Sequence, residues 1–393
     1  MGTQAMEAQA MIAAEPRPRT LIADDQPDVL EALRLLLKGA GFSTEAVTSP
    51  AAALDALRRE SFDLLLMDLN YARDTTSGYE GLNLLARVRE LDSELPVVVM
   101  TAWGSVDIAI EALRGGVTDF ILKPWENDQL IAMLRRHIKK GRAARDSQKL
   151  SAQRQQELSD ARAIQERLIP DSIPQLEGYT IAAAWEPART VGGDYYDVLS
   201  FDSDTIAMCI GDVSGKGMPA ALLMSNVQAA FRALATRNEL PAGICARLNS
   251  AVASSTRQDR FISFFYCVLE GRSGRLAYAN AGHNPPVLIR ANGSVERLEC
   301  GGSVLGPFEV ASYEQCETVI RSGDRLLMFT DGVTEACAPG GEEFGEERLI
   351  KLAVENRVMD AAGLRGAIID SLRGFTFGSF GDDVTLIVLS AGL

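Results

Sequence analysis

Five polar side chains stand at the ends of successive apolar runs in the first third of the chain. They are Asp24, Asp25, Asp68, Thr101 and Lys123. If these runs are parallel strands, their carboxyl ends meet at one edge of a sheet. Three carboxylates at that edge would form a hard oxygen site suited to Mg²⁺. Asp68 could then attack a phosphoryl donor, while Thr101 and Lys123 stabilise the charge of the acyl phosphate.

A second set of carboxylates lies in the C-terminal half, where four aspartates each neighbour a glycine at the end of a predicted strand. They are Asp194, Asp212, Asp331 and Asp382. Asp-Gly pairs also mark hairpin turns, so Asp331 taken alone would indicate a turn. Four such carboxylates with no histidine among them favour two hard divalent ions instead, Mn²⁺ or Mg²⁺. Two ions about 3.5–4 Å apart can activate a water molecule and clamp a phosphoryl group.

The elements that must position the first set alternate between short apolar runs and helical patterns. The predicted strands are residues 20–23, 43–47, 63–67, 97–101 and 119–122. Five β–α units in series predict an α/β fold over residues 18–139, with a doubly wound, five-stranded parallel sheet. Residues 1–17 carry neither pattern and are predicted to be a flexible tail.

The remainder of the chain divides into a helical linker and a second domain. Residues 140–170 are rich in helix-forming residues, and Pro170 ends them. Leu158, Ala161, Gln165 and Leu168 alternate in steps of three and four, which predicts a coiled-coil seam and a homodimer. Residues 171–393 mix strand alternation with helical patterns, which predicts an α+β domain of layered sheets flanked by helices.

The composition excludes several classes of function. The net charge of −14 argues against nucleic acid as the main partner. No apolar run reaches the roughly 18 residues of a membrane helix. The N-terminal residues also lack the pattern of a secretory signal, so we expect a cytoplasmic protein that does not bind membranes. The six cysteines are scattered and form no C-x-x-C pair, which predicts reduced thiols rather than disulfides or a zinc site.

Residues 18–140 resemble the receiver domain of bacterial response regulators. The resemblance rests on the acidic set and on residues 100–102 (MTA) and 119–124 (DFILKP). It implies that Asp68 is the phosphoacceptor and that a sensor histidine kinase is the partner. The Mg²⁺ ligands it implies are Asp24, Asp25 and Asp68. The switch residues it implies are Thr101, Lys123 and Phe120.

The C-terminal half resembles the bacterial, SpoIIE/RsbU-like branch of the PPM (type 2C) serine/threonine protein phosphatases. The resemblance covers residues 163–388. Its motifs are residues 191–197 (VGGDYYD), 211–217 (GDVSGKG), 280–283 (NAGH) and 330–335 (TDGVTE). It implies an α-β-β-α sandwich that holds two Mn²⁺ or Mg²⁺ ions.

The same resemblance implies a role for each acidic residue. Asp212 would bridge the two metals beside the Val213 carbonyl, and Asp331 and Asp382 would complete the site that activates water. Asp194 would hold a further ligand position. Asp383 would lie behind the ligands, and Arg189 could bind phosphate.

The proton donor for the leaving group stays open at this point. Eukaryotic relatives place a histidine two positions after the bridging aspartate, where this chain has Ser214. Metal-bound water is one donor, and His283 is a rival. A structural role in its loop is the alternative for His283.

Together these features predict a response regulator whose output is a metal-dependent protein serine/threonine phosphatase gated by phosphorylation of Asp68. The resemblance implies a phosphorylated anti-anti-sigma factor of the STAS type as substrate. The alternative is a non-enzymatic adaptor that binds a sigma-factor regulator. Degenerate phosphatase domains of that kind lose their aspartates, whereas this chain keeps the full set. The sequence alone decides neither the sign of control by Asp68 nor the choice of metal.

Overall fold

The computed structural model describes residues 16–71, 79–102, 111–255 and 260–392. The chain forms two compact units, Met1–Arg154 and Gln155–Leu393, which are described separately. Most of the predicted N-terminal tail, residues 1–15, lies outside the described residues. In the described part of the chain, no helix is both long and apolar enough to cross a membrane.

The first unit is built on a five-stranded sheet with the order β2-β1-β3-β4-β5, and every neighbouring pair is parallel. Its strands are β1 (Arg19–Ala23), β2 (Ser43–Val47), β3 (Leu64–Asp68), β4 (Val97–Ala102) and β5 (Asp119–Lys123). The prediction of a doubly wound parallel sheet is therefore confirmed. All five residues of β3 are buried, as expected for a central strand covered on both faces.

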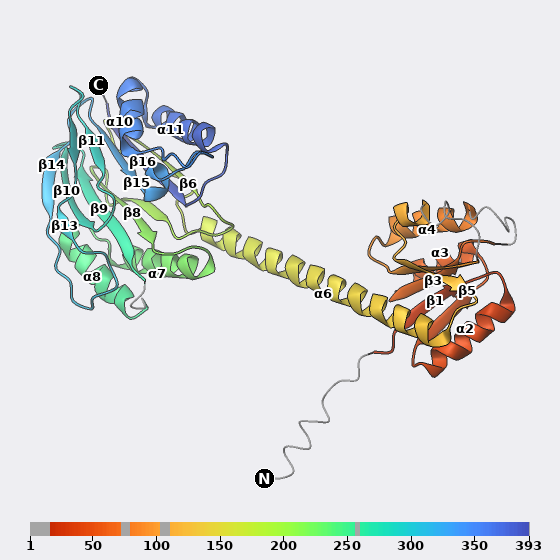
Figure 1. Cartoon of the computed structure of the whole chain (residues 1–393). Helices are drawn as coiled ribbons and strands as arrows, with labels where there is room; N and C mark the ends of the chain where they lie inside the picture. The colour runs from red at the N-terminus through yellow and green to blue at the C-terminus, as the bar shows by residue number, and fades with distance from the viewer. Residues whose placement is uncertain (1–15, 72–78, 103–110, 256–259, 393) are drawn as a thin grey trace, which may run out of the picture. The chain divides into compact units, whose positions relative to one another are not determined.

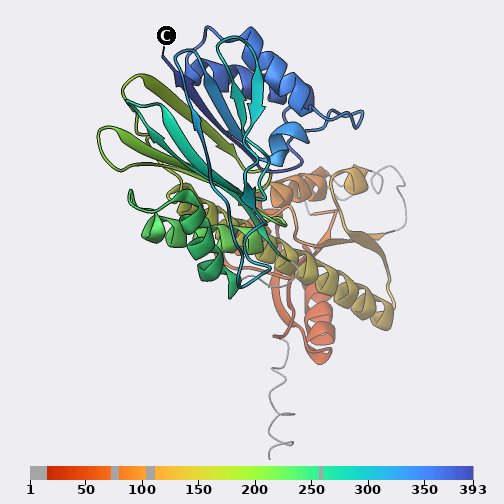
Figure 2. The ribbon, with the colours of Figure 1, turned by 90° about the vertical axis from the view of Figure 1, so that its left-hand side faces the viewer.

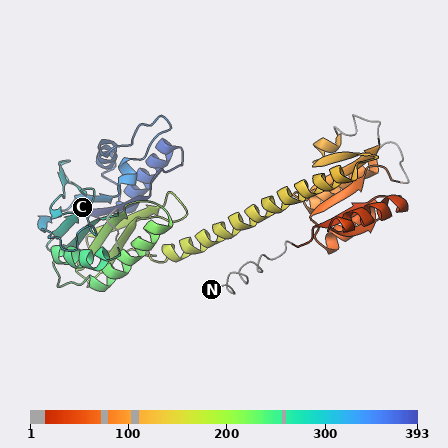
Figure 3. The ribbon, with the colours of Figure 1, turned by 60° about the horizontal axis from the view of Figure 1, so that its bottom comes forward.

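Helices cover both faces of this sheet. They are α2 (Pro27–Gly39), α3 (Pro50–Arg59), α4 (Tyr79–Leu91) and the first turns of α6 (Asn127–Glu166). Side chains of α3 and α4 share one core with the sheet, while those of α2 and α6 share the other. Figure 3 shows the red helix α2 lying along one face of the orange sheet. Helical spacing is also predicted at residues 108–113, before β5; residues 108–110 lie outside the described residues, and residues 111–113 are helical.

Helix α6 is continuous over 40 residues. Leu130, Leu134 and Ile138 anchor its beginning in the first core. Its predicted seam is corrected at one position, because Gln165 is only 3% exposed and packs within the second unit. Leu168 also packs against the core of that unit. The coiled coil and the homodimer remain predictions.

The second unit contains two sheets. The first has the order β13-β10-β9-β8-β7, with β14 also paired to β10, and the second has the order β12-β11-β15-β16-β6. The strands of the first sheet are β7 (Tyr195–Ser200), β8 (Thr205–Val213), β9 (Ile262–Glu270), β10 (Arg275–Ala281), β13 (Gly301–Gly302) and β14 (Cys316–Val319). Those of the second sheet are β6 (Tyr179–Glu186), β11 (Val287–Ile289), β12 (Val295–Arg297), β15 (Arg325–Phe329) and β16 (Val384–Ala391).

Helices flank the two sheets on their outer sides, as Figures 1 and 2 show. The helices are α7 (Met218–Leu234), α8 (Pro241–Ala253), the short α9 (Asp331–Thr334), α10 (Glu346–Glu355) and α11 (Ala361–Thr376). The residues of α7 and α8 share a core with the first sheet, and those of α10 and α11 share one with the second. The predicted layers of sheets flanked by helices are therefore confirmed.

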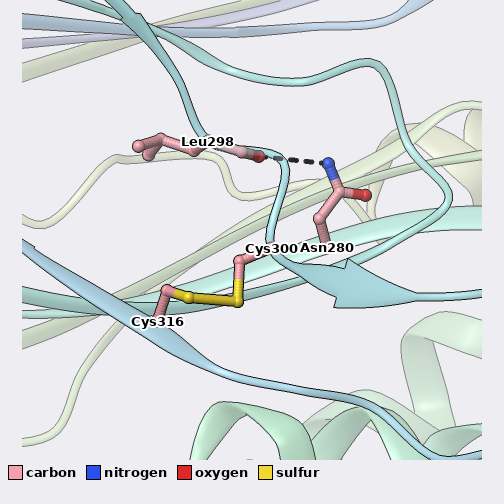
Figure 4. Close-up of a disulfide and its surroundings, with 4 residues drawn as sticks. All are labelled: Asn280, Leu298, Cys300 and Cys316. Carbon is pink, nitrogen blue, oxygen red and sulfur yellow. Dashed lines mark hydrogen bonds between the residues drawn. A yellow bond between two sulfur atoms is a disulfide. The ribbon is translucent and has the colours of Figure 1, made fainter.

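One prediction about the cysteines is wrong. Cys300 and Cys316 form a disulfide with a Cα–Cα distance of 5.9 Å (Figure 4). Strands β13 and β14 both pair with β10, which brings the two cysteines together although 16 positions separate them. The other four cysteines are free thiols, as predicted.

Candidate functional site

The first acidic set converges at the carboxyl edge of the parallel sheet. Lys123 Nζ lies 2.8 Å from Asp24 Oδ2 and 2.7 Å from Asp68 Oδ2. Asp68 Oδ1 also accepts a hydrogen bond from the Leu69 amide at 2.7 Å. Burial acts to lower the pKa of Lys123, but its hydrogen bonds to both carboxylates outweigh burial and raise it. Lys123 therefore stays charged and offsets part of the repulsion between the carboxylates.

This pocket fits a hard divalent cation. Oxygens of Asp24, Asp25 and Asp68 all lie within 4.8 Å of one another, and no other described group of at least three acidic, histidine or cysteine residues meets that limit. Asp24 is fully buried and Asp68 is 5% exposed. Among the described residues, Lys123 is the cation paired with these carboxylates, so a divalent ion with oxygen ligands would balance the charge.

The predicted switch residues Thr101 and Phe120 lie on β4 and β5. Thr101 is partly exposed near the end of β4, where its register partner is Leu122. Phe120 is 37% exposed. Tyr71 was not predicted as a site residue; it is buried, and its hydroxyl donates to the Ala23 carbonyl at 3.2 Å. Burial and the pocket carboxylates raise the pKa of Tyr71, and its position shortly after Asp68 was the available signal.

The second acidic set gathers at the ends of β8, β15 and β16. Burial, together with the charges of Asp331 and Asp382, raises the pKa of Asp212 to about 7. Burial and Asp382 likewise raise the pKa of Asp331. Carboxylates that raise one another's pKa in this way are held close together without enough positive charge. Divalent cations would supply that charge.

Two threonines, which the sequence analysis did not assign, orient Asp194. Thr330 Oγ1 and Thr385 Oγ1 donate to Asp194 Oδ2 at 2.7 and 2.6 Å. The Trp185 indole donates to the Asp194 carbonyl at 3.1 Å. Burial, followed by the charge of Asp212, raises the pKa of Asp194 well above its ordinary value. Asp194 and Asp212 lie close enough for their titrations to be linked when no cation is bound.

Asp383 braces the backbone around this cluster. It accepts hydrogen bonds from the Ala188 amide at 2.8 Å and the Gly193 amide at 2.6 Å. A Cβ on Gly332 would lie 2.0 Å from the Asp383 carbonyl oxygen, so only glycine fits there. This arrangement agrees with a supporting position behind the ligands.

Lys216 and the Val213 carbonyl lie at the same site. Lys216 Nζ lies 2.7 Å from Asp382 Oδ2 and donates to the Gly381 carbonyl at 2.7 Å. The Val213 carbonyl lies 2.9 Å from where a Cβ on Gly193 would stand. The donors are therefore carboxylates and a carbonyl, which suit Mn²⁺ or Mg²⁺. The 4.8 Å limit that the receiver carboxylates meet suits the ligands of one ion. Carboxylates that would hold two ions about 4 Å apart can lie further from one another.

The rim of the cluster carries two arginines and a hydrogen-bonded loop. Arg189 Nη1 lies 4.0 Å from the Cβ position of Gly217, and Arg260 Nη1 lies 3.9 Å from that of Gly215. Ser214 accepts a 2.8 Å hydrogen bond from the Phe261 amide through Oγ. Ser214 thus holds two loop segments together, which is a structural task.

His283 is buried in the interior of the second unit. Its side chain is held by Ser263, and its main chain is held by Asn280. Burial lowers its pKa to about 4, while the Phe329 carbonyl acts in the opposite direction. The imidazole is therefore neutral at pH 7, which argues against His283 as the proton donor.

Comparison with known proteins matches each unit to a family. The response regulator receiver domain family matches residues 20–135, and the Stage II sporulation protein E (SpoIIE) family matches residues 202–392. Phosphoserine phosphatase RsbU of Bacillus subtilis is 33% identical over 234 residues, which cover 59% of this chain and 69% of RsbU. Protein IcfG of Synechocystis is 30% identical over 262 residues, which cover 59% of this chain but only 41% of IcfG.

A solved structure supports the fold of the second unit. The SiaA-PP2C domain of Pseudomonas aeruginosa aligns with 61% of this chain and 98% of its own length, with a TM-score of 0.54 and 21% identity. The matches to receiver and phosphatase families agree with the two acidic sites. The chain therefore belongs to the SpoIIE-type, PP2C-fold family of serine/threonine phosphatases and carries an N-terminal response regulator receiver domain.

Proposed function

We propose that this chain hydrolyses phosphoserine or phosphothreonine in a protein substrate, requires two Mn²⁺ or Mg²⁺ ions, and is gated by phosphorylation of Asp68. The observation that carries the proposal is the convergence of Asp194, Asp212, Asp331 and Asp382 in one charge-deficient cluster. RsbU bears the name phosphoserine phosphatase, which supports this reaction class.

Different residues of the second unit would hold the ions, orient a ligand and bind the phosphoryl group. When bound, the two ions would supply an activated water and neutralise the phosphoryl oxygens. Asp194, Asp212, Asp331 and Asp382 would hold the ions as ionised carboxylates. Thr330 and Thr385 fix the orientation of Asp194. Arg189 at the rim binds a phosphoryl oxygen through its guanidinium.

Gln165 supports control by the receiver. Its side-chain amide donates to the Gly192 carbonyl at 2.6 Å and accepts from the Gly192 amide at 3.0 Å. Gly192 precedes Gly193 and Asp194, so the end of α6 holds the loop that carries a proposed ligand. The beginning of the same helix packs in the receiver core. A phosphoryl group on Asp68 adds charge to a two-state domain and biases α6.

The proposed substrate is a phosphorylated anti-anti-sigma factor of the STAS type, and the proposed phosphodonor is a sensor histidine kinase. Both follow from the resemblance to partner-switching phosphatases and receivers.

The test measures phosphate release from a phosphoserine peptide and an aryl phosphate in Mn²⁺, with and without beryllofluoride. We expect turnover that requires Mn²⁺, changes with beryllofluoride and disappears in Asp212→Asn. Asp370→Asn is the matched control, because it removes the same charge from a side chain that is 79% exposed. Turnover that persists in Asp212→Asn would refute the proposed site.

The gating has its own variant. Gln165→Ala removes both hydrogen bonds to Gly192, so we expect turnover to respond less to beryllofluoride while Mn²⁺ dependence remains. An unchanged beryllofluoride response in Gln165→Ala would contradict this route of control. The same unresponsiveness in the parent chain would contradict gating by Asp68.

A further inference from the structure

His283 lies in a turn that the structure holds from two sides. The residue follows β10, and Gly282 before it has a positive φ of 69°. Asn280 Oδ1 accepts from the His283 amide at 2.7 Å, and Asn280 Nδ2 donates to the His283 carbonyl at 3.0 Å. Asn280 Nδ2 also reaches the Leu298 carbonyl, next to the disulfide of Cys300 (Figure 4). The position of the imidazole is therefore fixed by the main chain.

The Nδ1 atom of this imidazole faces the strand beside Asp212. His283 Nδ1 lies 2.8 Å from Ser263 Oγ. Ser263 is the register partner of Asp212 in the antiparallel pair of β9 and β8. Directly paired residues project from the same face of a sheet, so Ser263 stands next to the Asp212 carboxylate. His283 is thus connected to the residue beside Asp212 through a single hydrogen bond, the one to Ser263.

The opposite side of the ring faces the second sheet. The Phe329 carbonyl acts on the imidazole, and Phe329 is the last residue of β15, two positions before Asp331. The whole of His283 is only 5% exposed, and within the described residues no hydrogen bond of normal geometry reaches His283 Nε2, so the Phe329 carbonyl acts on it from a longer distance. A buried nitrogen that is satisfied only weakly is costly, so its retention calls for a reason.

We propose that His283 is a positioning residue that sets the spacing between the strand pair carrying Asp212 and the strand carrying Asp331. The inference rests on the proposed metal-dependent function, and it assigns His283 no part in proton transfer. A two-ion site built from carboxylates of both sheets would require the sheets to hold those carboxylates at a defined separation. A rigid imidazole between the sheets meets that need, whereas a smaller side chain would leave a gap into which the strands relax.

The test is Mn²⁺ binding to the full chain, measured by calorimetry without substrate. Every variant carries Asp25→Asn as a common background, which weakens the competing receiver site. We expect His283→Ala to weaken Mn²⁺ binding at the phosphatase site by at least about tenfold. We expect His283→Asn to restore most of it, because its amide can reach Ser263 from the Nδ1 position. Ser263→Ala should weaken binding by a smaller factor.

The matched control is the other histidine of the chain. His137 is also buried, and its Nε2 contacts Asp119 Oδ2 at 2.8 Å, but it lies in the first unit. His137→Asn should leave Mn²⁺ affinity at the phosphatase site unchanged. Near-ultraviolet circular dichroism and thermal unfolding identify any variant that fails to fold. If His283→Ala fails to fold, Ser263→Ala tests the inference in its place.

The outcomes distinguish failure of the positioning role of His283 from failure of the proposed function. Parental Mn²⁺ affinity in folded His283→Ala, or in Ser263→Ala when His283→Ala does not fold, would overturn the positioning role. Loss of affinity that His283→Asn does not restore at all would also overturn it, because the hydrogen bond to Ser263 would then be irrelevant. Absence of Mn²⁺ binding in the Asp25→Asn parent would refute the proposed function itself, and the inference would fall with it.

Discussion

Replacing Asp212 with asparagine is expected to stabilise the metal-free protein while it destroys the proposed metal site. Burial and the charges of Asp331 and Asp382 raise the pKa of Asp212 from its ordinary value of 3.8 to about 7. Asp212 therefore ionises at a higher pH in the folded protein than in the unfolded chain. Stability is lost as the pH rises from about 4 to about 7, and the loss is complete above that window. Asparagine has nearly the same size as aspartate and does not titrate.

The size of the effect follows from the pKa difference. One pKa unit corresponds to about 1.4 kcal/mol, so ionising Asp212 in the folded protein costs about 4 kcal/mol at pH 8. At pH 5 the loss of folding stability caused by Asp212 is only about 2 kcal/mol. Folded Asp212 is still protonated at this pH, whereas the carboxyl of the unfolded chain is largely ionised. The stabilisation by Asp212→Asn should therefore grow by about 2 kcal/mol between pH 5 and pH 8.

The assay is urea unfolding in EDTA at both pH values, followed by tryptophan fluorescence in a background where Trp103 and Trp125 are replaced by Phe, so that the signal reports Trp185, whose indole contacts the Asp194 carbonyl. Asp370→Asn should change the unfolding free energy by less than about 0.5 kcal/mol, since its carboxylate is exposed. Added Mn²⁺ should stabilise the parent but not Asp212→Asn. An Asp212→Asn protein no more stable than the parent at pH 8, or equally stabilised at both pH values, would refute the reasoning.

Three further predictions concern the stability of the second unit, each read from urea unfolding. Arg232→Met should cost about 3 kcal/mol, because it leaves the fully buried Asp197 without its charged partner, which lies 2.7 Å away; a loss below about 1 kcal/mol would contradict this. Cys300→Ser should cost about 3 kcal/mol under oxidising conditions, and reduction of the parent by a dithiol should produce the same loss. The lowered pKa of His283, about 4, means that the unfolded chain takes up this proton first as the pH falls below 6.5. The parent should therefore lose about 3 kcal/mol more than His283→Asn between pH 7 and pH 4, and parallel pH profiles would contradict the burial of a neutral imidazole.

The receiver site was largely predictable from the sequence, because parallel strands bring their carboxyl ends to one edge. Once the apolar runs are read as strands, Asp24, Asp68 and Lys123 must meet there, and the structure places them within hydrogen-bonding distance. Continuous apolar runs such as β3 signal burial on both faces without any tertiary information.

The partners within the second acidic site were not predictable in this way. Its aspartates come from strands of two different sheets, and sequence spacing does not report how sheets stack. The roles of Thr330 and Thr385 depend on both hydroxyls reaching Asp194 Oδ2, which requires β15 and β16 to be neighbours. Helix α11 was also missed, because its glycines weaken the helical signal, while packing on β6 and β16 stabilises it.

Two features show where local pattern ends and tertiary structure begins. The sequence by itself determined that residues near Gln165 are helical, but the same spacing suits a seam between chains or a contact within one chain. In the structure, Gln165 makes a contact within the chain, because it hydrogen-bonds to Gly192. The sequence likewise determined that Cys300 and Cys316 were present without a pairing motif. Only the shared edge of β10 brought them together, because a disulfide depends on distance in space and not along the chain.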